Sequence, residues 1–305
     1  MSEKTEPKPP TELPPEHPTK KDDLLRVPDH VLITKVVPYF GFKDYALLST
    51  ASQYLQAHWQ EAQQKNPMPL YVPEDCATLN KAVERVHGDP RITTIVVGEG
   101  VHQIDGRYLW ISSAMKIVGR PDVPKEKIVV VGGIEFKQGI QGNCHLQHLT
   151  LRQAKQHGVN GTSSFTMDDI LVEQCGLYGV LAYGTGVVSR CTNVEVRQCG
   201  MSGVVAEYSA SITLIGAKTT VHHNCTTGTS WWYGLSVVGR SSTIQLVSPL
   251  TKEQVSTDNG GGGNWGARVG GADIHQIKTI DAIGPADESP GETKYFQQIG
   301  IQLRF

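Results

Sequence analysis

The sequence predicts a mainly β protein, in which a right-handed parallel β-helix follows a small N-terminal α-helical module. Three observations predict the β-helix. Glycine is abundant, at 32 of 305 residues, and aromatic residues make up only 7% of the chain, a balance typical of turn-rich β proteins. The third observation is a phrase that occurs twice, Val-x-Gln-Cys-Gly-x-x-Gly-Val, at 172–180 and 196–204.

The repeated phrase belongs to a longer internal period. Similar segments end at Gly158, Gly179, Gly203, Gly234 and Gly266. β-Hairpins do not explain the period, because no Asn-Gly or Asp-Gly turn marks each midpoint, and the leucine ladder of leucine-rich repeats is missing. Stacked coils of about three short strands, with glycine at the sharp turns, fit the pattern. We count roughly six or seven such coils between residues 93 and 283.

Composition and periodicity divide the chain into elements. Residues 1–23 are rich in proline and charge and predict a disordered tail. Residues 24–65 carry apolar residues at helical spacing and predict two or three helices. Three prolines make residues 66–75 an extended linker. Residues 76–86 predict a short amphipathic helix, after which β-branched runs closed by glycine predict strands, so that the β-helix domain covers residues 76–305.

Residues 24–65 also carry a recognisable pattern of apolar, proline and aromatic positions. Its segments are Val27-Pro28-Asp29, Val31-Leu32, Val36-Val37, Tyr39-Phe40, Asp44, Leu47-Leu48 and Ser52-Gln53-Tyr54-Leu55. The pattern resembles an F-box, from which Pro38 departs. The resemblance implies docking onto the Skp-type adaptor of a cullin–RING ubiquitin ligase through Pro28, Val31, Leu32, Val36, Val37, Tyr39 and Phe40. The alternative is a helical cap on the following domain.

The segment at 78–120 runs from the short helix into Ile- and Val-rich stretches closed by glycine. It resembles the N-terminal capping helix and first coil of parallel β-helix families, which include pectin-lyase-like enzymes and non-enzymatic relatives. F-box proteins with parallel β-helix repeats act as substrate receptors of cullin–RING ligases. The combined resemblance therefore implies a binding protein, whose β-helix captures a substrate protein that the sequence does not identify.

Charge and composition exclude several classes of partner. A net charge of -2 and a pI near 6.6 argue against nucleic acid and acidic membranes as partners. The sequence contains no run of about 18 apolar residues, so no membrane span is expected. The N-terminus lacks the apolar core of a signal peptide. We therefore expect a cytoplasmic or nuclear protein. No cofactor is expected, because the glycine-rich stretch 260–266 lacks the Lys-Ser/Thr of a phosphate-binding loop.

No constellation of residues predicts catalysis or metal binding. The adjacent aspartates at 168–169 would point to opposite faces of a strand, so solvated turn carboxylates are favoured over a catalytic pair. The Cys and His residues within 144–148 and 222–225 lie several coils apart and do not complete one tetrahedral metal site. A charge ladder on the surface is predicted for three stacked residues, Arg152, Glu173 and Arg197. A role for one of these arginines in an active site is the alternative.

The six cysteines are predicted to be free, buried thiols, and none belongs to a Cys-x-x-Cys pair. The position of Cys175 in the repeat is Ala154 in one neighbouring coil and Asn224 in another. That position requires a small residue rather than a thiol, so the repeated cysteine is interpreted as part of the scaffold.

The residue just before each repeat glycine is expected to stack on its equivalent in the next coil, so that these residues form a column. Ser202 is the small member of this column, and the other members are larger side chains. Two inserted loops, at 226–233 and 256–265, emerge at the same edge. The predicted ligand-binding or partner-binding residues are His157, Tyr178, Trp231, Trp232, Tyr233 and Trp265. The alternative is that these aromatic side chains only shield the core. Two other functions stay open, a carbohydrate-binding or polysaccharide-modifying β-helix and a structural assembly subunit.

Overall fold

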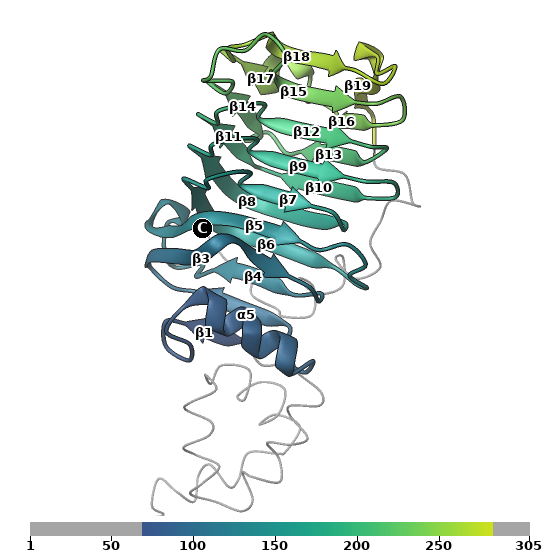
Figure 1. The fold of residues 1–305 in the computed structure, drawn as a ribbon. Helices are drawn as coiled ribbons and strands as arrows, with labels where there is room; N and C mark the ends of the chain where they lie inside the picture. Colours follow the sequence, from purple (N-terminus) through teal and green to yellow (C-terminus); the bar gives the residue numbers. More distant parts are fainter. Residues whose placement is uncertain (1–68, 283–305) are drawn as a thin grey trace, which may run out of the picture.

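The computed structural model describes residues 69–282, which form a parallel β-solenoid of about 6 turns (Figure 1). The predicted tail, the F-box-like module with its adaptor-binding residues, and the chain after residue 282 lie outside the described residues. Of the two α-helices in the described part, neither has the length and apolar character needed to cross a membrane.

The strands stack into three parallel faces that run along the solenoid. Face 1 contains β1 (Leu70–Val72), β2 (Thr94–Val97), β4 (Lys116–Gly119), the first parts of β6 (Cys144–Arg152) and β8 (Phe165–Glu173), β10 (Val188–Thr192), β13 (Ser211–Ile215), β16 (Thr243–Val247) and β19 (Ile277–Ile280).

Face 2 contains the first parts of β3 (Gly100–Ile111) and β5 (Ile128–Phe136), the last parts of β6 and β8, β11 (Glu195–Arg197), β14 (Thr220–His222) and β17 (Ser256–Thr257). Face 3 contains the last parts of β3 and β5, β7 (Val159–Gly161), β9 (Val180–Tyr183), β12 (Val204–Glu207), β15 (Tyr233–Val238) and β18 (Gly263–Arg268). The sequence prediction of about three short strands per coil is confirmed.

The core is a set of apolar columns inside the coils. On face 2, one column consists of Leu151, Val172, Val196 and Val221, which are paired from strand to strand and fully buried. Each such side chain contributes about 1.5–3 kcal/mol of burial free energy. A single coil cannot bury these side chains by itself, so this stabilisation depends on the coils above and below it.

Helix α5 (Leu79–Gly88) covers the N-terminal end of the core (Figure 1). Its N-cap Thr78 accepts a hydrogen bond from the backbone N–H of Lys81, and one apolar stripe of the helix is buried. The predicted capping helix is thus confirmed. Within the predicted linker at 66–75, Leu70–Val72 pairs with β2 as the first strand of the solenoid.

The bend from face 2 to face 3 has the same construction in successive coils. It begins with a residue in the left-handed region, with φ between 54° and 57° at Gln153, Gln174, Gln198 and His223. The next position is small and buried in each coil, namely Ala154, Cys175, Cys199 and Asn224. This arrangement confirms the interpretation of the repeated cysteine as a scaffold residue. The six cysteines are free and buried, as predicted.

Further along this buried column, asparagine replaces cysteine and joins adjacent coils. The backbone N–H of Cys199 donates to Oδ1 of Asn224 at 3.1 Å, and Nδ2 of Asn224 donates to the carbonyl of Val196 at 3.0 Å. Asn259 continues the ladder and donates through Nδ2 to the carbonyl of Val221. These carboxamides satisfy backbone groups that would otherwise be buried without a partner.

Two short 3-10 helices and one short α-helix complete the described elements. They are η3 (Lys125–Lys127), α6 (Lys252–Val255) and η4 (Ile274–Gln276). The η3 segment lies against β5, β6 and β8, where the Thr150 hydroxyl donates to the carbonyl of Lys125 at 2.9 Å. It is held there also by Asp169, whose carboxylate binds Lys125 at 2.7 Å and His148 at 2.6 Å. Asp169, with a φ of 52°, is therefore a structural residue of the bend between faces 1 and 2.

Candidate functional site

The predicted aromatic column is only partly formed. Strand pairing aligns the repeat glycines up to Gly234, as expected. In the last coil, however, the partner of Tyr233 is Gly263, and Trp265 pairs with the core residue Leu235. Trp265 packs against the hydrophobic core and does not belong to the column. The predicted alignment of this coil is wrong by two residues, because Asn264 and not Gly266 lies opposite Gly234.

Three of the remaining residues form, with Arg268, a compact unit that we call the aromatic cluster. The rings of His157 and Tyr178 stack at a centroid distance of 4.9 Å, and Trp232 meets Tyr178 edge-on at 5.5 Å. The guanidinium of Arg268 lies 4.1 Å from the Trp232 ring centroid and donates to the Tyr178 hydroxyl at 3.2 Å. The cluster therefore joins three coils and one inserted loop.

One member of the aromatic cluster contacts an apolar patch on the outer side of face 3. Leu181, Val205 and Val238 form this patch, and Tyr178 packs against it. Burial, followed by the charge of Arg107, lowers the pKa of His157 to about 4, so this imidazole is neutral near pH 7. Tyr178 therefore covers outward-facing apolar side chains, and His157 stacks on Tyr178.

Two other predicted residues differ in their surroundings. Trp231 projects from the inserted loop with 63% of its surface exposed. Tyr233 is half-buried, and its ring lies so close to Gly262 and Gly266 that a Cβ on either glycine would fall within 2.6 Å of it. Of the six predicted residues, Trp231 is the one whose ring is mainly accessible.

A second candidate site, which the sequence reasoning did not select, is an open groove on face 2. It has a volume of about 720 Å³ and runs across successive coils from β3 to β11. Its lining residues are Val101, Gln103, Val129, Val131, Arg152, Gln153, Glu173, Gln174, Arg197 and Gln198. Three valines make one part of the floor apolar, whereas charged and carboxamide side chains fill the other part.

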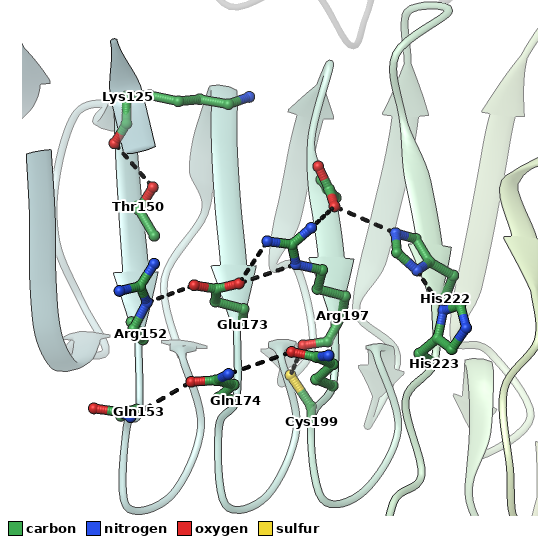
Figure 2. Close-up of polar contacts among 12 residues, drawn as sticks. Lys125, Thr150, Arg152, Gln153, Glu173, Gln174, Arg197, Cys199, His222 and His223 are labelled. Carbon is green, nitrogen blue, oxygen red and sulfur yellow. Dashed lines mark hydrogen bonds and ion pairs between the residues drawn. The ribbon is translucent and has the colours of Figure 1, made fainter. Parts of the chain in front are cut away.

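The charged part of the groove is a row of ion pairs one coil apart (Figure 2). Arg152 binds Glu173 through Nε at 2.5 Å, and Arg197 binds the other oxygen of Glu173 through Nε at 2.9 Å and Nη2 at 2.8 Å. The predicted charge ladder is thus confirmed. The Glu173 side chain is only 4% exposed. Burial by itself raises the pKa of Glu173, but the hydrogen bonds from Arg197 and Arg152 outweigh burial and hold this pKa below its usual value.

The two arginines are not equivalent. Arg197 is fully engaged, because Nη1 also donates to Glu195 at 2.8 Å. Within residues 69–282, Arg152 donates through Nε alone, and its side chain is 36% exposed. The row continues beyond Arg197 to His222, whose Nε2 lies 3.3 Å from Glu195 and whose Nδ1 lies 2.7 Å from Nδ1 of His223.

A ladder of three glutamines borders the row of ion pairs (Figure 2). Nε2 of Gln153 donates to Oε1 of Gln174 at 3.4 Å, and Nε2 of Gln174 donates to Oε1 of Gln198 at 3.3 Å. All three are exposed and have left-handed backbones. For a non-glycine residue that conformation costs on the order of 1 kcal/mol, and asparagine or glycine tolerates it better than glutamine. The same left-handed position opens this bend at His223 as well, so the conformation belongs to the construction of the bend.

The side chains of these sites offer charged groups, carboxamide hydrogen-bonding groups and apolar surface. Among the described residues, no group of three or more His, Cys, Asp or Glu side chains is arranged to hold a metal ion. The clusters considered in the sequence are occupied otherwise: His145 contacts the hydroxyl of Thr166 at 2.7 Å, and burial raises the pKa of Cys144 to about 11.

Comparison places the chain in no family. No family model, no curated protein and no solved structure matches it. Any function must therefore be argued from the residues of the two sites.

A usable signal for the groove was present in the sequence. Gln153, Gln174 and Gln198 occupy the same position in three successive copies of the repeat, directly after Arg152, Glu173 and Arg197. The glutamine of the repeated phrase, and not its cysteine or glycine, carries this signal. The valine floor is harder to foresee, because outward and inward valines look alike in a strand of continuous apolar residues such as 128–131.

Proposed function

We propose that this chain is a non-enzymatic binding protein of the substrate-receptor type. Its F-box-like N-terminal module docks a Skp-type adaptor of a cullin–RING ligase, and its right-handed β-helix captures a partner protein. The module is supported by its sequence resemblance. The capture role is supported by one structural observation, the open groove on face 2.

Three properties of the groove favour a protein partner. Its binding groups stand on stacked strands, so little conformational entropy is lost when a ligand orders them. The glutamine ladder offers donors and acceptors of the kind that pair with a peptide backbone. Val101, which is 65% exposed, and the half-buried Val131 offer apolar contact beside these polar groups, whereas Val129 is buried.

The adaptor half of the proposal is tested by pull-down of the full chain with a Skp-type adaptor. We expect stoichiometric binding by the wild type and its loss in Leu32→Asp and Tyr39→Ala. Thr220→Ala, on face 2, is the matched control and should bind like the wild type. Failure of the wild type to bind, or binding that both variants retain, would overturn the F-box assignment.

Carbohydrate binding is the second candidate, because Trp231 offers an exposed aromatic ring beside the aromatic cluster. Aromatic rings of this kind present an apolar face to a ligand. The test is a glycan array with the wild type and Trp231→Ala, together with a lyase assay on uronic-acid polymers. Silence in both assays removes this candidate. A stable stoichiometric partner other than the adaptor, found by co-purification, would instead favour a structural assembly subunit.

A further inference from the structure

We infer that the groove on face 2 binds an extended aliphatic peptide segment that carries a carboxylate, with Arg152 as the anchor of that carboxylate. The inference rests on the proposed function, since it takes the groove as the partner-binding site, and it adds the chemical class of the ligand. Three independent features lead to it: the terminal nitrogens of Arg152, the valine floor and the glutamine ladder.

Arg152 supplies the anchor. Its Nε is bound to the carboxylate of Glu173, whereas its Nη1 and Nη2 have no hydrogen-bond partner among residues 69–282. The same ion pair fixes the orientation of the guanidinium, so that its terminal N–H groups are presented to the groove without further ordering. A fork of this kind matches a carboxylate, which binds arginine through two parallel hydrogen bonds. Arg197 cannot serve in this way, because all three of its nitrogens are engaged.

The charge of the groove favours an anionic ligand. Its charged lining residues are Arg152, Arg197 and Glu173, so the lining carries one net positive charge. The pKa of Glu173 lies below its usual value because both arginines bind it, so its charge is already compensated. Glu195 binds Arg197 from outside the lining at 2.8 Å and balances its charge, so the row of ion pairs as a whole is neutral. Arg152 is the cation of the row whose terminal nitrogens no residue within 69–282 binds, and it is the group that favours an anionic ligand.

The valine floor determines what accompanies the carboxylate. Val131 pairs with Arg152 from the adjacent coil, and Val129 and Val101 pair along the same face. Val101 is 65% exposed. Strands in a sheet lie about 4.8 Å apart and an extended peptide advances about 3.3 Å per residue, so aliphatic side chains one to three residues from the carboxylate reach this floor.

The glutamine ladder can hold the peptide backbone along the opposite border. Its internal hydrogen bonds use Nε2 of Gln153, both polar atoms of Gln174 and Oε1 of Gln198. Oε1 of Gln153 and Nε2 of Gln198 have no partner in the described part of the chain. They provide an acceptor at one end of the ladder and a donor at the other, as a peptide backbone requires.

The test uses the full-length chain and fluorescently labelled short peptides in an anisotropy titration. One arm carries a Glu or Asp side chain flanked by valine and leucine, with both termini blocked, and its control replaces the acid with Gln or Asn. A second arm has no acidic side chain but a free C-terminal carboxylate, and its control is amidated. The two arms distinguish a side-chain carboxylate from a C-terminal one. A third arm is an oligouronate.

We expect at least one peptide arm to bind about tenfold or more tightly than its neutral control. Arg152→Gln should remove this preference and Arg152→Lys should restore part of it. Arg240→Gln, an exposed arginine outside the groove, should bind like the wild type. Because Glu173 keeps Arg197 as a partner, Arg152→Gln should remain folded, which thermal unfolding verifies.

The contrary outcomes separate the inference from the proposed function. If acidic and neutral peptides bind equally and Gln174→Arg abolishes both, the groove binds peptides and the carboxylate inference is wrong. If the oligouronate binds through Arg152 and the peptides do not, or if no peptide binds, the inference is again overturned. The fate of the receptor proposal then depends on the adaptor pull-down, which none of the groove variants affects.

Discussion

The groove on face 2 and the aromatic cluster on face 3 share the coils of β6 and β8, yet their polar groups are used differently. In the aromatic cluster, Arg268 lies over Trp232 and donates to Tyr178, and Tyr178 packs against an apolar patch. In the groove, Arg152 and the ends of the glutamine ladder keep hydrogen-bonding capacity that the described residues do not use.

Loop length explains the difference. From Gln153 to Gly158, from Gln174 to Gly179 and from Gln198 to Gly203, the bends between faces 2 and 3 are equally short. The corresponding bend after His223 is longer and carries Trp231 and Trp232. Short bends leave the outer side of a coil accessible, whereas the long one supplies side chains that cover it. In this solenoid, the length of the inserted loop in each coil thus determines how much of the outer surface of that coil is accessible to solvent.

Acidification should separate the two regions and give the largest effect. His157 has a pKa of about 4 in the folded chain, below the usual value near 6.5. Between about pH 6.5 and pH 4 the imidazole is therefore protonated in the unfolded chain and neutral in the folded chain. The free energy of unfolding falls as the pH drops through this interval, by up to roughly 3 kcal/mol. Urea unfolding at a series of pH values measures this loss, and His157→Gln should flatten it. An unchanged profile in that variant would show that another group is responsible.

The groove should respond at lower pH and through Glu173. Its pKa is lowered in the folded chain, so its contribution is present above the unfolded value near 4.3 and is lost as the pH falls through the folded value. We expect Glu173→Gln to destabilise the chain by roughly 1–3 kcal/mol at pH 7, since two arginines lose a buried partner, with little difference from the wild type in strong acid. Glu195→Gln, at a more exposed carboxylate, is the control and should cost less. Equal costs for the two variants would contradict the central role of Glu173.

Arg268→Gln should have a smaller effect. It removes the contact with Trp232 and the hydrogen bond to Tyr178, together worth roughly 1–2 kcal/mol. It also removes Nε, which is buried without a hydrogen-bond partner, and this offsets part of the loss. A net cost of about 1 kcal/mol in urea unfolding, with a shift in tryptophan fluorescence, is expected. Arg240→Gln should cause neither change, and a null result for Arg268→Gln would mean that the cluster does not stabilise face 3.

The sequence was sufficient for the coils and insufficient for the contacts between distant ones. The glycine followed by an apolar residue aligned the strands from Val159 to Leu235 correctly, because a sharp turn and a buried column impose the same residue types in each coil. The alignment failed at Trp265, where the inserted loop changed the spacing and a large residue occupied a core position.

Contacts that join distant segments carry no such periodic signal. Arg268 and Tyr178 are 90 residues apart, and Lys125 and Asp169 are 44 residues apart. Their meeting depends on side-chain reach and on the paths of non-repeating loops. The groove is predictable only in part from the sequence. Its glutamines recur in the repeat, but the inserted loops decide whether these side chains face solvent or a covering loop.

The smallest effect on stability is the most informative about the groove. Gln174→Gly removes two weak ladder hydrogen bonds, at 3.4 and 3.3 Å, and also relieves a left-handed backbone with φ of 57°. Each change is worth about 0.5–1 kcal/mol and the two have opposite signs, so urea unfolding should move by less than about 1 kcal/mol. If the ladder holds a ligand backbone, peptide affinity should nevertheless fall severalfold in the anisotropy titration. Gln245→Ala, in β16 on face 1 and outside the ladder, provides the control for a lost carboxamide. If the glutamine ladder serves only the fold, Gln174→Gly should lower stability and leave peptide affinity unchanged. This one variant therefore shows whether the ladder stabilises the solenoid or binds a ligand.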